Sequence, residues 1–135
     1  MNILEQAAKR GSEARAEYGP AAPGFTRTAQ YWSVLFGIPV TAEQVVMAFV
    51  LNKITRESYA HKEDNLVDIA GYAAVLEQLR VEQKANAEFR GIVARMTDAE
   101  LRAELDNFPP PRQRSILEQA IQRRFMADWQ SGSIA

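Results

Sequence analysis

The feature that most limits what this chain can fold into is the spacing of its apolar residues, which recur every three or four positions along most of its length. Such spacing places apolar side chains on one face of a helix. The clearest case lies in residues 63–90, where one face would carry Leu66, Ile69, Ala70, Ala73 and Leu76. No stretch alternates between apolar and polar residues in the manner of a strand. The sequence therefore predicts an all-α fold.

Helix boundaries follow from capping signals, glycines and prolines. Thr41 with Gln44, and Thr97 with Glu100, have the spacing of a capping box, in which two side chains bond to the free amides of a helix start. We expect a turn-rich loop over residues 20–24 and a loose tail over residues 130–135. The predicted helices cover residues 2–17, 25–36, 42–58, 63–90, 97–105 and about 111–129.

Length and charge exclude several classes of protein. With 135 residues, the chain is long enough for a domain with a substantial core. Its formal net charge of −1 comes from 16 basic and 17 acidic residues, so stable nucleic-acid binding is not favoured. The sequence contains no cysteine and no apolar run long enough for a membrane span. We also expect no signal peptide, because residues 1–5 already include an acid and lead into a helical pattern. We therefore expect a cytoplasmic protein without membrane contact.

Two aspartates in the fourth predicted helix give the strongest indication of chemistry. Asp64 and Asp68 lie one turn apart on a helix that is apolar nearly all round after its first turn. Buried carboxylates need cationic partners, protons or metal ions. Because only a few residues separate this helix from the preceding one, we expect the two to be antiparallel. That packing would place Glu57 beside Asp64, and Lys53 or Asn52 near Asp68.

The predicted cluster has two interpretations. Carboxylates on facing helices can hold Mg²⁺ or Mn²⁺, while Lys53 and Arg56 would neutralise a bound polyphosphate. Alternatively, the acids and bases form a structural ion-pair network, and Asp64 only caps its helix. Both interpretations can hold for the same protein before any ligand is bound.

Residues outside this cluster are weaker candidates. Glu13 and Glu17 form an acid pair near the end of the first helix, where a solvated face is a simpler explanation than a pair of metal ligands. Trp32 and Tyr72 could stack on a base, although aromatic residues at helical spacing more often form a core. The single histidine, His61, is expected at the surface of the turn between the third and fourth helices.

Several of these residues together resemble a known family. The segments are NILEQAA at residues 2–8, EYG at 17–19, Phe25 and Trp32, K-x-x-R at 53–56 and DNLVDIAGYA at 64–73. Over roughly residues 2–80 the pattern resembles phage-encoded MazG-like all-α nucleotide pyrophosphohydrolases, and residues 53–73 are its most specific part. The resemblance implies a helical bundle that converts a (deoxy)nucleoside triphosphate, with dGTP or GTP expected, to the monophosphate and pyrophosphate.

The resemblance also implies roles for individual residues and an organisation of the chain. Asp68, Lys53 and Glu57 would be catalytic, and metal ions would be held by Glu17, Glu57, Asp64 and Asp68. The substrate would contact Lys53, Arg56, Asn65, Tyr72 and Trp32. The catalytic domain would cover residues 1–90, with residues 91–135 as a helical extension for packing or oligomerisation in a homodimer or homotetramer.

The chain departs from the usual signature of that family, which has E-E-x-x-E on one helix and E-x-x-D on the next. Here the first of these helices offers Lys53, Arg56 and Glu57, and the second offers Asp64 and Asp68. Either Glu57 and a first-helix acid, Glu13 or Glu17, complete the metal site, or fewer metal ions bind. A different hypothesis is a non-enzymatic nucleotide-sequestering or protein-interaction module in which the same cluster is only structural.

Overall fold

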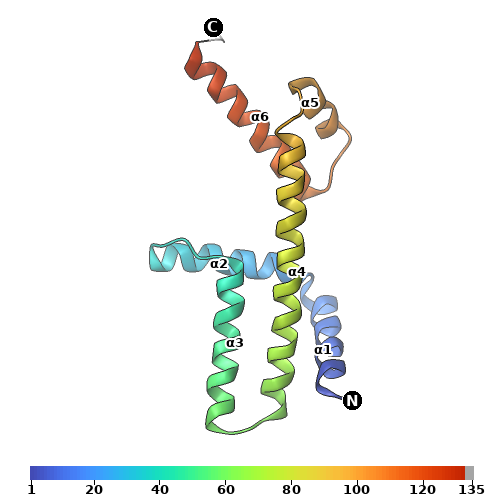
Figure 1. Cartoon of the computed structure of the whole chain (residues 1–135), viewed down its shortest axis with the longest axis vertical. Helices are drawn as coiled ribbons and strands as arrows, with labels where there is room; N and C mark the ends of the chain where they lie inside the picture. The colour runs from blue at the N-terminus through green and yellow to red at the C-terminus, as the bar shows by residue number, and fades with distance from the viewer. Residues whose placement is uncertain (133–135) are drawn as a thin grey trace. The chain divides into compact units, whose positions relative to one another are not determined.

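A computed structural model describes residues 1–132, and within them the chain forms six α-helices and no strand. The all-α prediction is therefore confirmed (Figure 1). The helices are α1 (Ile3–Tyr18), α2 (Ala21–Phe36), α3 (Ala42–Tyr59), α4 (Glu63–Val93), α5 (Asp98–Asp106) and α6 (Pro111–Ser131). None of these helices combines the length and apolar composition that a membrane span requires.

Capping boxes fix the starts of three helices. The Thr41 hydroxyl accepts a hydrogen bond from the Gln44 amide at 3.2 Å, and the Gln44 side chain accepts one from the Thr41 amide at 2.9 Å. Thr97 and Glu100 form the same reciprocal pair at the start of α5, so both predicted capping boxes are confirmed. Asn2 forms a third box at the start of α1, because asparagine is also a favoured capping residue.

Two predicted boundaries are wrong. The segment 20–24 is not a loop, because α2 begins at Ala21 and includes Pro23. A proline in the first helical turn removes an amide that has no partner within the helix anyway, so the helix tolerates it. The predicted loose tail is also wrong at its start, because α6 runs to Ser131 and ends at Gly132 in the left-handed conformation. The rest of that tail, residues 133–135, lies outside the described residues.

The chain divides into two compact units, Met1–Val81 and Glu82–Ala135, which we call unit 1 and unit 2. The division falls within α4 and earlier than the predicted boundary after residue 90. The reason is that Phe89 and Val93, in the last turns of α4, pack with residues of α5 and α6.

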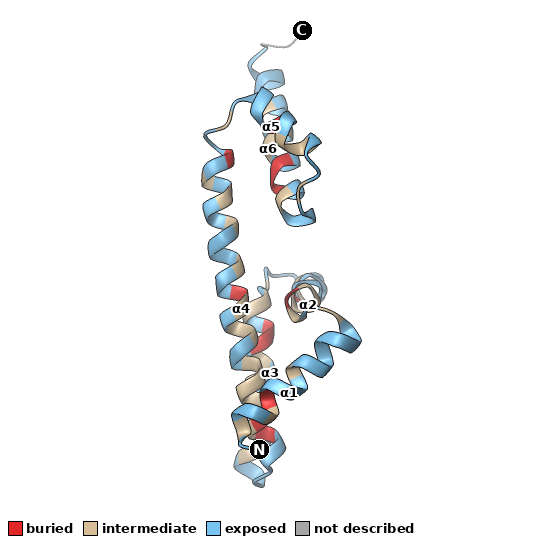
Figure 2. Ribbon diagram, turned by 90° about the vertical axis from the view of Figure 1, so that its right-hand side faces the viewer, coloured by how far each residue is buried: buried red, intermediate tan, exposed pale blue. Residues whose placement is uncertain are grey.

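Unit 1 is built from α1, α2, α3 and the first part of α4. In Figure 1, α3 and α4 run antiparallel, as predicted, and α2 crosses them. Its buried cluster consists of Ala22, Val46 and Leu79, against which partly buried side chains from α2, α3 and α4 pack: Phe25, Ala42, Tyr72, Val75 and Leu76. Several of the apolar residues of α2 and α3 remain exposed. Pale blue, which marks exposed residues, appears on α2 in Figure 2. The predicted all-round burial of α4 is correct at Val67 but not at Ala73 and Ala74.

Unit 2 has a separate apolar core. Leu101 and Leu117 are completely buried, and Val93 and Ile116 are nearly so. Ion pairs surround this core, with Arg124 bonded to Asp98 at 2.9 Å and Arg112 bonded to Glu82. Arg124 also donates to the Val93 carbonyl, which lies near the end of α4, at 3.2 Å. The three helical segments of unit 2 are thus joined by both apolar and polar contacts.

Candidate functional site

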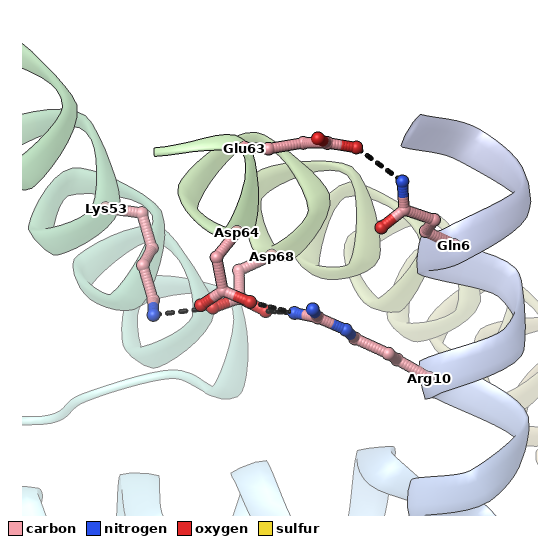
Figure 3. Close-up of polar contacts among 6 residues, drawn as sticks. All are labelled: Gln6, Arg10, Lys53, Glu63, Asp64 and Asp68. Atoms are coloured by element: carbon pink, nitrogen blue, oxygen red, sulfur yellow. Dashed lines mark hydrogen bonds and ion pairs between the residues drawn. The ribbon is translucent and has the colours of Figure 1, made fainter. Parts of the chain in front are cut away.

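Three helices of unit 1 bring the charged candidates together. Asp64 and Asp68 lie one turn apart on α4, Lys53 lies on α3, and Arg10 lies on α1. Figure 3 shows the two carboxylates between the two cationic side chains. The antiparallel connection of α3 and α4 places Lys53 level with Asp68, as the sequence predicted.

The contacts form one continuous network. Lys53 Nζ lies 2.5 Å from Asp68 Oδ2. Arg10 Nη1 lies 3.5 Å from the other oxygen of the same carboxylate, Oδ1, and donates to Asp64 Oδ1 as well (Figure 3). Both aspartates therefore converge on one guanidinium nitrogen. We call these four residues the acid–base network.

Exposure differs across the acid–base network. The side chains of Lys53 and Asp68 are only 16% and 25% exposed, whereas that of Asp64 is 57% exposed. Water screens ion pairs less where side chains are shielded, so the Lys53–Asp68 contact is the stronger one. The Arg10 guanidinium lowers the pKa of Asp64 through hydrogen bonding and its charge, and Asp64 in turn raises the pKa of Arg10. Asp64 is therefore ionised at neutral pH.

Glu57 belongs to a different local arrangement. Its carboxylate accepts hydrogen bonds from the Lys62 amide at 3.1 Å and from Asn65 Nδ2 at 3.0 Å, and it contacts His61 Nδ1. These contacts lower the pKa of Glu57 to about 2, and the contact with His61 has the largest effect. Glu57 thus closes the turn between α3 and α4 and lies against Asn65, the neighbour of Asp64. Its expected role as a metal ligand stays a prediction, as does the role of Asn65 in binding substrate.

The other predicted site residues lie apart from the acid–base network. Arg56 is exposed on α3, and Glu17 is exposed at the end of α1, beside Tyr18, whose pKa it raises through a hydrogen bond. Trp32 contacts Phe36 and Phe49 within an aromatic cluster. This packing matches the alternative to base stacking, in which aromatic residues at helical spacing form a core. The functional roles expected for these three residues stay predictions.

Tyr72 is the predicted site residue that connects the charged and apolar parts of unit 1. Its ring packs on Phe25 and Phe49, with centroid distances of 6.4 and 5.7 Å. Burial raises the pKa of its hydroxyl, and the charge of Asp68 raises it further. The hydroxyl therefore stays protonated and can donate a hydrogen bond.

The sequence did not single out Arg10. The first helix places Gln6 and Arg10 one turn apart, and these two reach Glu63 and Asp64, with Gln6 Nε2 lying 2.5 Å from Glu63 Oε1 (Figure 3). A polar Gln/Arg pair at this spacing is a weak signal, because the chain has many basic residues on helices. Only the docking of α1 against α4 identifies the pair.

A groove in unit 1 adjoins the acid–base network. Its volume is about 690 Å³, and its walls come from α1, α2 and α4. Much of the lining is alanine and glycine, together with the rings of Phe25 and Tyr72. Arg10 and Asp68 belong both to this lining and to the network. We call it the α1–α4 groove.

Comparisons with known proteins place most of unit 1 in a family. The family described as "Domain of unknown function (DUF6378)" matches residues 2–80. A curated relative, the Gene 55 protein of Mycobacterium phage L5, is 37% identical over 84 residues, which cover 60% of this chain and 54% of that protein. The chain thus spans about half the length of this relative. No solved structure matches the chain.

Proposed function

The chain belongs to the DUF6378 family, and we propose that it is a metal-dependent nucleoside triphosphate pyrophosphohydrolase. The observation that carries this proposal is the convergence of Asp64 and Asp68 on one cationic nitrogen, with Lys53 on the other side of Asp68. Two carboxylates that together attract one positive charge can attract a metal ion at the same position. The resemblance of residues 53–73 to MazG-like enzymes supports the same reaction.

The donor set fits a metal ion that arrives with its substrate. Among residues 1–132, no group of three or more acidic or histidine side chains lies close enough to hold an ion. Mg²⁺, however, is commonly held by one or two carboxylates together with water and substrate phosphates. Asp64 and Asp68 meet that requirement. When bound, the ion would polarise the α-phosphate and activate a water molecule.

The two cations of the acid–base network would serve the phosphates. Before substrate binds, Arg10 and Lys53 neutralise the two aspartates. A nucleotide–metal complex offers each charged group a new partner, because the carboxylates can bind the metal while the guanidinium and ammonium groups bind phosphate oxygens. After this exchange, Arg10 and Lys53 would stabilise the negative charge that develops on the pyrophosphate leaving group.

A second candidate function is a nucleotide-sequestering or protein-interaction module without catalysis. The observation that favours it is that the network is already neutral, since two cations face two carboxylates. A metal ion must therefore displace ion pairs that already satisfy the acids. Binding of a nucleotide without any dependence on divalent metal would support this second function.

A titration of Mn²⁺ with and without a non-hydrolysable triphosphate analogue tests the proposed metal site. We expect Mn²⁺ to bind weakly to the protein alone and at least tenfold more tightly with the analogue, because the phosphates complete its ligands. Asp68→Asn should remove this gain. Equal Mn²⁺ affinity in wild-type and variant protein, with the analogue present, would count against the site.

We propose further that the protein self-associates through two apolar stripes of unit 1. The α2 stripe contains Tyr31, Val34 and Leu35, and the α3 stripe contains Met47, Leu51 and Ile54. Val34 and Leu35 are 85% and 74% exposed. The sequence has no charged residue between Arg27 and Glu43, and charge depletion together with exposed large apolar residues is typical of the core of an interface. A second copy would cover these stripes in a homodimer or homotetramer.

A further inference from the structure

The volume of the α1–α4 groove suits a small organic ligand. Sites for such ligands occupy roughly 300–1,000 Å³ and combine a largely apolar wall with a few polar groups. The groove measures about 690 Å³, and its lining is mostly apolar. Gly71 lines it from α4 and Gly24 from α2, and a Cβ atom added at either position would meet no neighbouring heavy atom within 4 Å. The space beside these two residues is therefore free.

The charged residues that line the groove favour an anionic ligand. The described lining contains three arginines, Arg10, Arg15 and Arg27, and one acid, Asp68. An apolar peptide or lipid tail would gain little from three guanidinium groups, whereas phosphate oxygens bind them through charge-assisted hydrogen bonds. Arg10 and Asp68 also place one part of the groove at the acid–base network.

The aromatic residues of the groove suit a planar ring. Phe25 and Tyr72 form part of its wall and meet edge to face, with an interplanar angle of 81°. Aromatic side chains of this kind are common contacts for nucleic-acid bases. The charge of Asp68 acts on the Tyr72 hydroxyl, and both residues line the groove. The aromatic wall of the groove therefore adjoins its charged end.

We propose that the α1–α4 groove binds the base and sugar of a nucleotide whose phosphates extend to Arg10 and Lys53, beside the metal ion that Asp64 and Asp68 would hold. This inference rests on the proposed function and names the part of the molecule that recognises the nucleoside. Base selectivity would then reside in the groove, and the acid–base network would bind the polyphosphate of any nucleotide.

Filling the groove is the direct test. Gly71→Leu would place an apolar side chain in the free space, and a helix favours leucine over glycine, so the fold should persist. Gly24→Leu fills the groove from α2 and serves as the second variant. Gly91→Leu is the matched control, because Gly91 lies on α4 outside the groove and its Cβ would come no nearer than 4.0 Å to the end of the Arg95 side chain.

Affinities for two probes, each with Mg²⁺, separate the nucleoside from the phosphates. The probes are a non-hydrolysable nucleoside triphosphate analogue and inorganic tripolyphosphate. We expect wild-type protein to bind the nucleotide analogue about tenfold or more tightly than tripolyphosphate, from stacking and apolar burial. The two groove-filling variants should lose this difference and keep their tripolyphosphate affinity, and Gly91→Leu should behave as wild-type protein does.

Each other outcome overturns a defined part of the account. If both groove-filling variants bind the nucleotide analogue as tightly as wild-type protein, or if wild-type protein does not prefer it to tripolyphosphate, the nucleoside does not bind in the groove. The proposed function would survive either result. If wild-type protein binds neither probe, the proposed function fails and the groove assignment fails with it.

Discussion

Unit 1 and unit 2 differ in what they bury and in what they leave open. Unit 2 is the smaller, yet it encloses the fully buried Leu101 and Leu117 within a largely apolar core. Unit 1 has more residues, but its largest fully buried side chains are the smaller valines Val45, Val46 and Val67. It also keeps the acid–base network, the α1–α4 groove and the apolar stripes of α2 and α3 accessible.

This difference assigns different tasks to the two units. Unit 2 also has ion pairs and a groove of about 410 Å³, but unit 1 holds the acid–base network beside the larger α1–α4 groove. A sizeable, mostly apolar groove with a few polar groups is the usual form of a ligand site. The family match agrees with this division, because it ends at residue 80, next to the boundary at Val81. We therefore expect substitutions in unit 2 to change stability and those in unit 1 to change binding and turnover.

The largest expected effect is on the stability of unit 2. Leu101→Ala removes a completely buried side chain and should lower the free energy of unfolding by about 2–5 kcal/mol, because it leaves a cavity. Urea unfolding followed by tryptophan fluorescence measures this effect, since Trp32 reports on unit 1 and Trp129 on unit 2. Each tryptophan is read in a background where the other is phenylalanine. Equal shifts of both signals would show that the two units unfold as one.

The next effect concerns turnover. Asp68→Asn should reduce nucleotide hydrolysis at least hundredfold, which corresponds to about 2.7 kcal/mol in the activation barrier, because it removes the carboxylate shared by Lys53 and Arg10. The matched control is Asp98→Asn, which alters an ion pair of unit 2 and should leave the rate unchanged. Similar rates for Asp68→Asn and wild-type protein would exclude Asp68 from the reaction.

A smaller effect is expected on self-association. Leu35→Glu places a charge on the exposed α2 stripe and should weaken the association of two copies at least tenfold, because the charge would lose water on binding. Light scattering after size-exclusion chromatography measures the mass as a function of concentration. Val81→Glu is the control, since Val81 is also exposed but belongs to neither stripe. A monomeric wild-type protein at every concentration would contradict the proposed interface.

The smallest effect is on acid stability. Because the pKa of Glu57 falls from 4.5 to about 2 on folding, its ionised form stabilises the folded state above pH 4.5, and that contribution is lost as the pH falls towards 2. The lowered pKa of Asp64 acts in the same direction. Glu57→Gln should therefore make the melting temperature less sensitive to acid over this range. An unchanged pH profile in the variant would contradict the assigned contacts of Glu57.

Local signals explain why most of the fold could be predicted. Threonine capping boxes located the starts of α3 and α5 because their hydrogen bonds lie within four residues. The short turn after α3 made α3 and α4 antiparallel, and this brought Lys53 to Asp68. Pro23 was expected in a loop because proline usually ends a helix, but proline is also compatible with the first turn of a helix, where Pro23 lies.

The rest of the site depends on contacts that no local pattern specifies. Arg10 lies more than 50 positions before Asp64 in the sequence, and only the docking of α1 brings them together. The Glu57 carboxylate contacts His61 and Asn65. Its position on α3 alone did not reveal these partners. The α1–α4 groove, which three helices enclose, likewise exists only in the folded unit.

Hydrolysis of nucleoside triphosphates is best tested by product analysis after the protein is incubated with each of the common ribo- and deoxynucleoside triphosphates, with Mn²⁺ and with a chelator. We expect a nucleoside monophosphate and pyrophosphate, formed only with metal and lost in Asp68→Asn, with dGTP or GTP as the preferred substrate. Formation of a diphosphate and phosphate would contradict attack at the α-phosphate. Tight nucleotide binding without any turnover would contradict the enzyme and leave the sequestering module as the function of this site.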